Sequence, residues 1–314
     1  MRVVMMGTGP FAVPTLRRLY ESRHDVVALF TRPVRPLHGK SQAEANPMRD
    51  TAVARGTTVH DPESINEPHA RAVLAGYRPD LLVVCDYGQI LAPETLEIAR
   101  YGGINLHASL LPKYRGAAPI NWAIYHGETE TGVTIIHMTP RIDAGPAIAQ
   151  SATPIGDQET AAELEPRLAE LGAPLVLESI DAIEAGTVRS IPQDRALATR
   201  APRLKKELGQ VDWSRSAAAI ANQVRALQPW PKTYTFWQRP AGEPLRLILD
   251  RVHVEQAAAA TAGVVLEAAG DRLVIGTGQE SLVVDSIQPA GKRVLSASEF
   301  LRGYPVKPGE RFGS

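Results

Sequence analysis

Cysteine is almost absent from this sequence, since Cys85 is the only one among 314 residues. A single thiol cannot close an internal disulfide, so a disulfide framework is excluded and a reducing compartment, the cytoplasm, is expected. One cysteine and a few scattered histidines also provide no cluster at the spacing of metal ligands. We therefore expect no metal cofactor.

Long apolar runs are missing as well. The first apolar stretch ends at Gly7, too early for the apolar region of a signal peptide. No run approaches the ~20 residues that a helix needs to span a bilayer. We therefore expect no membrane partner.

The sequence has no net charge, but its two parts differ. Residues 1–200 hold 19 Lys and Arg against 23 Asp and Glu, whereas residues 201–314 hold 15 against 11. A modestly basic C-terminal part is compatible with a polyanion that contacts one end of the molecule. An uneven scatter of surface charge is the alternative explanation.

Gly7, Gly9 and Ala12 follow an apolar run at the spacing of a dinucleotide-binding turn. Pro10 stands after the second glycine, however, and has no N–H to offer a pyrophosphate. The acidic residue that would hold a ribose is also missing about twenty residues on, where the chain reads Thr31-Arg32-Pro33. The turn therefore predicts the first strand and helix of a Rossmann-like sheet without a nicotinamide cofactor.

The fold class that we predict is α/β: a Rossmann-like parallel sheet domain followed by a small OB-like β-barrel domain. In the first 150 residues, short apolar runs alternate with helical patterns, as in parallel sheets. The expected strands lie near 2–6, 25–31, 57–59, 80–85, 102–107, 131–138 and 146–152. The expected helices lie near 10–21, 47–55, 64–75, 92–99, 117–126 and 159–184.

Periodicity is lost after this part of the chain and returns with a different pattern. We expect a catalytic domain over 1–188, a linker over 189–212 and an OB-like domain over 213–314. The last begins with a helix near 214–226, for which Ser214 is a suitable N-cap. Short strands separated by Gly and Asp turns follow near 232–237, 245–252, 261–268, 271–276 and 281–288. The alanine-rich stretch Gln256–Ala262 is expected to be a loop between two of them.

The residues between 102 and 145 include a set suited to acid–base chemistry. Asn105 and His107 are two residues apart near the end of an expected strand, so their side chains share one face. Asp143 follows the next strand and is placed to meet His107, where a carboxylate would orient the imidazole and favour its protonated form. An amide beside an imidazole can stabilise an oxyanion and transfer a proton. Polar residues that merely form turns remain the alternative.

Several runs of this sequence resemble one enzyme superfamily. The run NLHASLLPKYRGAAPINWAI (105–124), TGVTI (131–135) and the loop at Asp143 resemble 10-formyltetrahydrofolate-dependent formyltransferases. MGTGPFAVPTL (6–16), QPWP (228–231) and QPAGKR (288–293) are similar to the methionyl-tRNA branch in particular. The matches occur in order along nearly the whole chain. The resemblance thus covers both expected domains.

This resemblance implies a function in translation initiation and one-carbon metabolism. The enzyme would transfer the formyl group of 10-formyltetrahydrofolate to the free amino group of methionyl initiator tRNA, with no obligate protein partner. It implies that Asn105, His107 and Asp143 are catalytic. It also implies that the folate contacts Tyr87, Gly88, Ser109, Leu110, Leu111 and Pro112. For the tRNA we expect contacts from Arg35, Lys40, Lys205, Lys206, Lys232, Lys292 and Arg293.

Two features depart from the family's pattern. The loop Arg32–Pro47 is less basic than is usual for a segment that reaches the acceptor end of tRNA. Cys85 and Asp86 stand before Tyr87, where small apolar residues are more common. The same resemblance leaves open a formyltransferase for an amino-sugar nucleotide and a hydrolase that releases formate. The dehydrogenase suggested by the opening turn and a non-catalytic RNA-binding protein are the alternatives from other classes.

Overall fold

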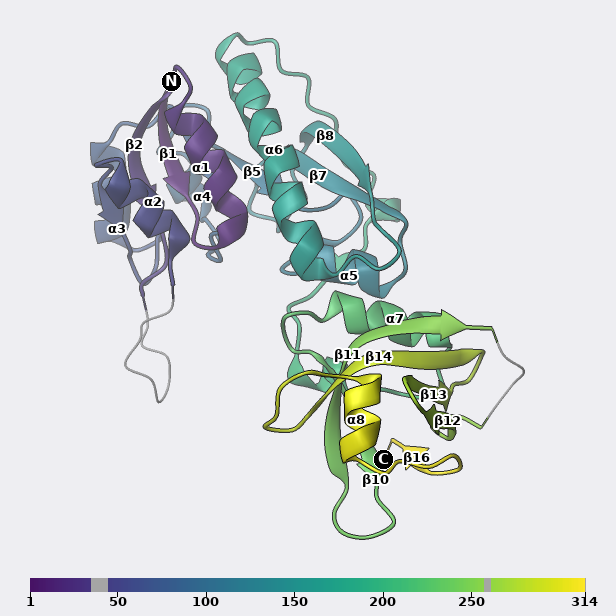
Figure 1. Ribbon diagram of the computed structural model, residues 1–314. Helices are drawn as coiled ribbons and strands as arrows, with labels where there is room; N and C mark the ends of the chain where they lie inside the picture. The colour runs from purple at the N-terminus through teal and green to yellow at the C-terminus, as the bar shows by residue number, and fades with distance from the viewer. Residues whose placement is uncertain (35–44, 257–260, 314) are drawn as a thin grey trace. The chain divides into compact units, whose positions relative to one another are not determined.

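The computed structural model describes residues 1–34, 45–256 and 261–313 (Figure 1). Two of the residues predicted to contact tRNA, Arg35 and Lys40, lie outside the described residues, as does 257–260 of the expected loop Gln256–Ala262. The chain forms two compact units. Unit 1 comprises residues 1–119, 130–154 and 164–202, and unit 2 comprises 120–129, 155–163 and 203–314.

Unit 1 is built on a seven-stranded sheet with the order β3-β2-β1-β4-β5-β7-β8. Five strands are parallel: β1 (Arg2–Met6), β2 (Asp25–Phe30), β3 (Val59–His60), β4 (Leu81–Val84) and β5 (Gly103–His107). The last two are antiparallel: β7 (Glu130–His137) and β8 (Ala147–Pro154). The predicted Rossmann-like parallel sheet is confirmed, with an antiparallel pair at one edge. The strand order reverses beside β1, and ligands of open α/β sheets bind at such a point.

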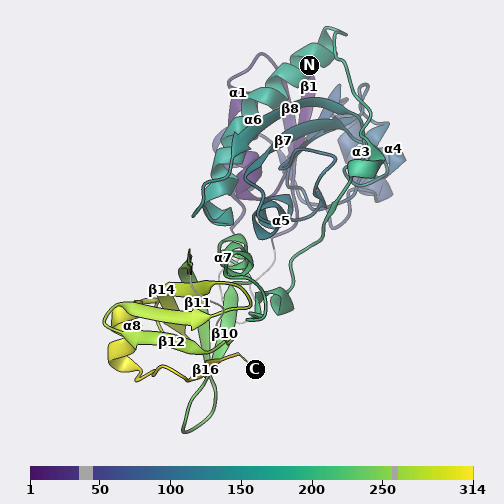
Figure 2. The same cartoon turned by 90° about the vertical axis from the view of Figure 1, so that its right-hand side faces the viewer.

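Helices cover both faces of this sheet (Figure 2). They are η1 (Pro10–Ala12), α1 (Val13–Tyr20), α2 (Pro47–Ala54), α3 (Pro68–Gly76), α4 (Pro93–Leu96) and α6 (Ala161–Glu184). Proline occupies the first position of α2, α3 and α4, where its missing N–H costs nothing and its fixed φ suits a helix. On one face, Val4, Phe30 and Val84 pack against Leu74 of α3 and Leu96 of α4.

A short parallel pair connects distant parts of unit 1. Strand β6 (Arg115–Gly116) pairs with β9 (Arg200–Ala201). A Cβ at Gly116 would overlap the backbone of Ala201, and its φ of 127° also favours glycine. Residues 189–202, which the sequence assigned to a linker, therefore lie within unit 1. The pairing of β9 with β6 joins residues far apart in the sequence, so no local periodicity predicts it.

Unit 2 contains an antiparallel, nearly closed barrel, which confirms the predicted second domain. Its strand order is β12-β13-β14-β11-β10-β16, and a bridge between Val264 and Arg311 joins the two edges. The strands are β10 (Thr233–Gln238), β11 (Leu245–Glu255), β12 (Val265–Ala269), β13 (Arg272–Gly276), β14 (Ser281–Pro289), β15 (Leu295–Ser296) and β16 (Arg311–Phe312). The helices of unit 2 are α5 (Pro119–Tyr125), α7 (Ala217–Ala226) and α8 (Ala297–Gly303), with the short 3₁₀ turn η3 (Lys206–Gly209). Another short 3₁₀ turn, η2 (Arg195–Leu197), belongs to unit 1.

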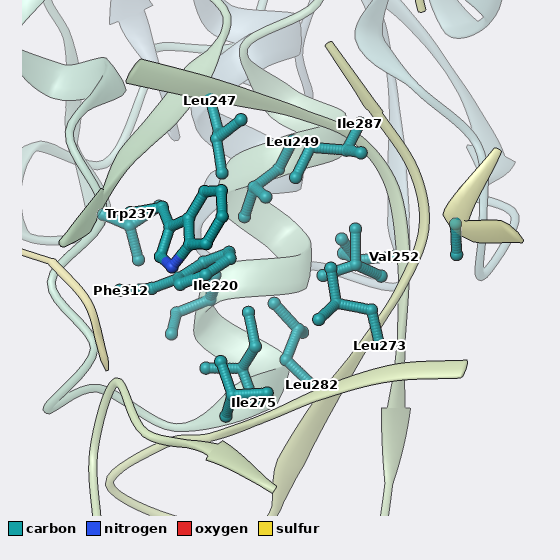
Figure 3. Close-up of a cluster of buried hydrophobic side chains, with 14 of the residues drawn as sticks. Ile220, Trp237, Leu247, Leu249, Val252, Leu273, Ile275, Leu282, Ile287 and Phe312 are labelled. Carbon is teal, nitrogen blue, oxygen red and sulfur yellow. The ribbon is translucent and has the colours of Figure 1, made fainter. Parts of the chain in front are cut away.

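The barrel core comes from alternate residues of its strands and from one face of α7. Trp237, Leu247 and Leu273 point toward Ile220 of that helix, and all four are buried (Figure 3). The N-cap of α7 is Ser216, whose hydroxyl accepts from the Ala219 N–H, so the predicted N-cap Ser214 is wrong by two residues. The Ser214 hydroxyl instead donates to Asp212. No described helix of the chain is long and apolar enough to cross a membrane.

Candidate active site

Three polar side chains meet at the carboxyl edge of the unit 1 sheet. Asn105 and His107 extend from the end of β5, and Asp143 lies in the loop that connects β7 to β8. The Asn105 Nδ2 lies 3.4 Å from Asp143 Oδ1, and the His107 Nδ1 lies 3.6 Å from Asp143 Oδ2. The structure therefore brings together all three residues that were predicted to be catalytic.

His107 is held from both sides of its ring and is 5% exposed. Its Nε2 lies 2.9 Å from the Tyr114 carbonyl oxygen. A carbonyl only accepts, so this contact requires a hydrogen on Nε2. Nδ1 is then the nitrogen that can gain or lose a proton, and it faces Asp143. Nε2 therefore anchors the ring to the backbone, and Nδ1 is the nitrogen that is available for proton transfer.

Asp143 adopts a left-handed conformation with φ of 48°. Its Oδ2 accepts from the Gly116 N–H at 2.9 Å, while its Oδ1 faces Asn105. A non-glycine residue at positive φ is uncommon, although aspartate is among those that tolerate it. The carboxylate is therefore oriented by one backbone donor and remains beside both other members of the set.

Gln193 fixes the loop that carries Asp143. Its Nε2 donates to the carbonyl oxygens of Asp143 at 2.9 Å and Gly145 at 2.7 Å. The guanidinium of Arg115 in turn donates twice to the Gln193 Oε1, at 3.0 and 2.6 Å. Sequence reasoning missed Gln193 because it lies in a stretch without periodicity. No motif in that stretch signals its position.

The loop Ser109–Pro112 follows β5 and is tied to the antiparallel edge of the sheet. The Thr134 hydroxyl donates to the Ser109 carbonyl at 2.6 Å and accepts from the Leu111 N–H at 3.1 Å. Gln150 on β8 donates to the Leu111 carbonyl at 2.7 Å. These bonds give the loop one conformation against β7 and β8.

The side chains of this loop differ in what they offer a ligand. Leu111 is 5% exposed and the Ser109 hydroxyl is bound to the Lys113 carbonyl, so both are largely occupied within the protein. Leu110 and Pro112 are half-buried. Of the four residues predicted to contact a folate in this loop, these two have the most surface to present.

Tyr87 and Gly88 follow β4, the strand next to β5. The Tyr87 side chain is buried in the core with Phe30 and Leu91, and burial raises the pKa of its hydroxyl. Among the described residues, that hydroxyl has no hydrogen-bond partner. Gly88 has φ of 76° beside the Arg32 side chain. At this loop, Gly88 is exposed while the Tyr87 ring packs inward.

Asp86 is the acid that departs from the family's pattern, and it too has a left-handed φ, of 47°. A Cβ at Gly9 would overlap its carboxylate, so glycine at that position allows the two loops to meet. Surrounding protein raises the pKa of Asp86, while Arg32 and the Gly9 N–H partly oppose the rise. Burial also raises the pKa of Glu165, and the nearby charge of Asp86 adds to it.

The described residues include one trio with the donor atoms of a metal site. The ligand atoms of His24, Asp181 and Glu184 lie within 4.8 Å of one another. The guanidinium of Arg23 already binds both carboxylates, however, at 2.6 Å for Asp181. Because a cation of the protein occupies these oxygens, the trio is better explained as an ion-pair cluster.

The predicted tRNA-contacting residues of unit 2 differ in their availability. Lys205, Lys206 and Lys292 are exposed. The Lys232 Nζ lies 3.3 Å from the Gln288 Oε1, and the Arg293 guanidinium forms an ion pair with Glu299 at 2.7 Å.

Two family models match the chain and together cover both units. The model described as "Formyl transferase" matches residues 1–180, and "Formyl transferase, C-terminal domain" matches residues 203–305. The fold and these two matches thus define a formyltransferase, and the alternatives of a dehydrogenase and of a non-catalytic RNA-binding protein are not supported.

Relatives that match over the full length narrow the class of formyltransferase to which the chain belongs. A methionyl-tRNA formyltransferase of Rhodopirellula baltica is 44% identical over 99% of this chain and 96% of its own length. One of Moorella thermoacetica is 42% identical over 100% of this chain and 99% of its own. The chain belongs to the methionyl-tRNA formyltransferase family.

Solved structures share the fold at low sequence identity. WlaRD, a sugar 3N-formyl transferase, has a TM-score of 0.67 at 17% identity, over 93% of this chain and 99% of its own. HypX from Aquifex aeolicus, solved with tetrahydrofolic acid, has a TM-score of 0.60 at 21% identity, over 96% of this chain and 47% of its own. At these identities the likeness concerns the fold alone.

Proposed function

We propose that this chain transfers the formyl group of 10-formyltetrahydrofolate to the amino group of methionyl initiator tRNA, in the cytoplasm and as a step of translation initiation. The observation that carries the proposal is the cluster of Asn105, His107 and Asp143 at one sheet edge. Full-length identity of 44% to a methionyl-tRNA formyltransferase supports the choice of acceptor.

Transfer requires a neutral amine to attack the formyl carbon, after which the bond from that carbon to N10 of the folate breaks. Negative charge grows on the formyl oxygen during the attack. The Asn105 amide can donate to that oxygen, and a protonated His107 can supply a second donor from Nδ1. The tetrahydrofolate nitrogen leaves with a proton, so no external oxidant or reductant is needed.

The proton that the amine loses needs an acceptor close to the reacting atoms. Asp143 lies beside both Asn105 and His107, and the Gly116 N–H fixes one of its oxygens. It can take the proton through a water molecule or stabilise the imidazolium of His107. Gln193 acts as a positioning residue, because it holds the backbone of the loop that carries Asp143.

For the substrates, we propose a catalytic domain, 1–188, to which the paired stretch 189–202 also belongs, and a tRNA-binding domain, 213–314. The folate would lie against Tyr87, Gly88 and the loop Ser109–Pro112. Lysine and arginine side chains of the second domain would bind tRNA phosphates, and Arg35 and Lys40 would approach the acceptor end.

The test is a formylation assay with 10-formyltetrahydrofolate and two acceptors, methionyl initiator tRNA and a nucleotide-linked amino sugar. Formyl-methionyl-tRNA should form at a kcat/KM at least 100-fold above that of the sugar. Preferential formylation of the sugar would favour the alternative acceptor. Release of formate without any acceptor would instead identify a hydrolase.

A further inference from the structure

An open groove of about 450 Å³ lies on the barrel of unit 2. It is lined by three aromatic side chains, two cations and a proline: Trp230, Tyr234, Phe236, Lys206, Arg246 and Pro231. Among the residues that the structure describes, no acid lines it. Aromatic residues make up only 5% of the chain, so the gathering of three beside two cations is a distinctive local feature.

The aromatic wall follows from the alternation of strand β10. Thr233, Thr235 and Trp237 point into the barrel core, which leaves Tyr234 and Phe236 on the outer face. The rings of these two residues lie 5.8 Å apart, edge to face. Folding of the core thus places the two aromatic side chains outside, where they are half-buried.

Trp230 stands before β10 and is 48% exposed. Burial of a tryptophan ring is strongly favourable, so a ring that is half open to solvent has apolar surface still to cover. A nucleobase is a flat ring that covers such a face by stacking, and base–aromatic stacking does not depend on the base.

The cations are positioned for a phosphate. Arg246 is directly opposite Phe236 in the pairing of β10 with β11, and its guanidinium lies 4.0 Å above the Tyr234 ring. That stacking holds the guanidinium in place while its N–H groups can still donate. Among the described residues, neither the Arg246 guanidinium nor the exposed Lys206 ammonium has a hydrogen bond or ion pair.

We propose that this groove binds one unpaired nucleotide of the RNA substrate, with its base stacked on Trp230 and its phosphate held by Arg246 and Lys206. The inference rests on the proposed function for the identity of the RNA. The two cations without a lining acid favour an anionic ligand, and the stacked aromatic wall favours one that carries a flat ring.

The test measures how the full-length chain binds two RNAs at one salt concentration: a fluorescein-labelled adenylate hexamer and a blunt RNA duplex. Trp230→Ala should weaken binding of the hexamer by roughly 5–100-fold, since it removes one base stack. Trp230→Phe should restore most of the affinity because it keeps a flat ring. Arg246→Ala should weaken the hexamer several-fold, whereas Lys307→Ala removes an exposed cation that does not line the groove and should have no effect.

The duplex and the formylation assay separate the possible outcomes. Trp230→Ala should leave binding of the duplex unaltered and should raise the KM for methionyl-tRNA rather than lower kcat. Hexamer binding equal to that of the unmodified chain, an equal loss on the duplex, or no rescue by Trp230→Phe would each overturn the inference. If the unmodified chain does not formylate methionyl-tRNA, the proposed function fails, and hexamer binding still decides on the groove.

Discussion

At the scale of single residues, the cluster of Asn105, His107 and Asp143 could be predicted because each member has a local signal. Asn105 and His107 share a strand face, and Asp143 follows the next strand. The contacts that orient them carried no such signal. The Tyr114 carbonyl reaches His107 through an irregular loop, and the amide of Gln193 reaches the Asp143 loop from a distant part of the chain. Neither contact is encoded in the spacing of the sequence.

Asp86 gives a prediction about stability and pH. Its pKa is raised in the folded protein, so ionisation there is less favourable than in the unfolded chain. The folded state therefore loses stability as pH rises from about 4 through the raised pKa, and the penalty is complete above it. Because Asp86 is exposed, water screens part of this penalty, and Asp86→Asn should raise Tm at pH 7 by about 2 °C at most.

The measurement for Asp86 is thermal unfolding between pH 4 and pH 8. The difference between Asp86→Asn and the unmodified chain should shrink as pH falls toward 4. Asp271→Asn, in the exposed turn before β13, removes the same formal charge and should change Tm little. A lower Tm for Asp86→Asn at pH 7 would mean that the carboxylate stabilises the fold, for example through Arg32.

At the scale of elements, apolar runs predicted the strands well because a buried strand needs several consecutive apolar residues. Strands β1, β4 and β5 lie within one or two residues of their expected bounds. The antiparallel direction of β7 and β8 is set by how the chain returns to the sheet edge, and no residue pattern predicts that direction. The N-cap differed because Asp212 binds the Ser214 hydroxyl and leaves Ser216 to cap the helix.

The loop after β5 gives a prediction that separates packing from binding. Leu111 is buried, so Leu111→Ala should destabilise the protein by about 2–5 kcal/mol. Leu110 is half-buried, so Leu110→Ala should mainly raise the KM for 10-formyltetrahydrofolate. Denaturant unfolding and steady-state kinetics of both variants check this. An unchanged folate KM in Leu110→Ala would remove this loop from the folate site.

At the scale of the whole molecule, two units were predicted from length and from the change in pattern. The stretch 189–202 belongs to unit 1, however, so this unit extends further than its periodic part. The basic charge of the C-terminal part was also predicted, but the ion pair of Arg293 with Glu299 was not. Only the side-chain positions show which lysine and arginine side chains already form ion pairs within the protein.

The charge of unit 2 gives a prediction about tRNA. Exposed Lys205 and Lys206 can each neutralise a phosphate, so Lys205→Ala with Lys206→Ala should weaken tRNA binding and reduce the slope of log K against log salt. The reduction should be roughly 0.7–0.9 per contact. Lys292→Ala with Arg293→Ala should have a smaller effect, because Arg293 is paired. Binding of tRNA across a salt series checks both, and equal slopes in all variants would mean that these are ordinary surface charges.

The most direct test of the account is the kcat for formyl transfer to methionyl initiator tRNA in Asp143→Asn, at saturating concentrations of both substrates. Asparagine tolerates the left-handed backbone and can still accept from the Gly116 N–H, so the loop is retained. What is lost is the negative charge beside Asn105 and His107. We predict a kcat roughly 10²–10⁴-fold lower, with a Tm near that of the unmodified chain. A kcat close to that of the unmodified chain would contradict a catalytic role for this carboxylate.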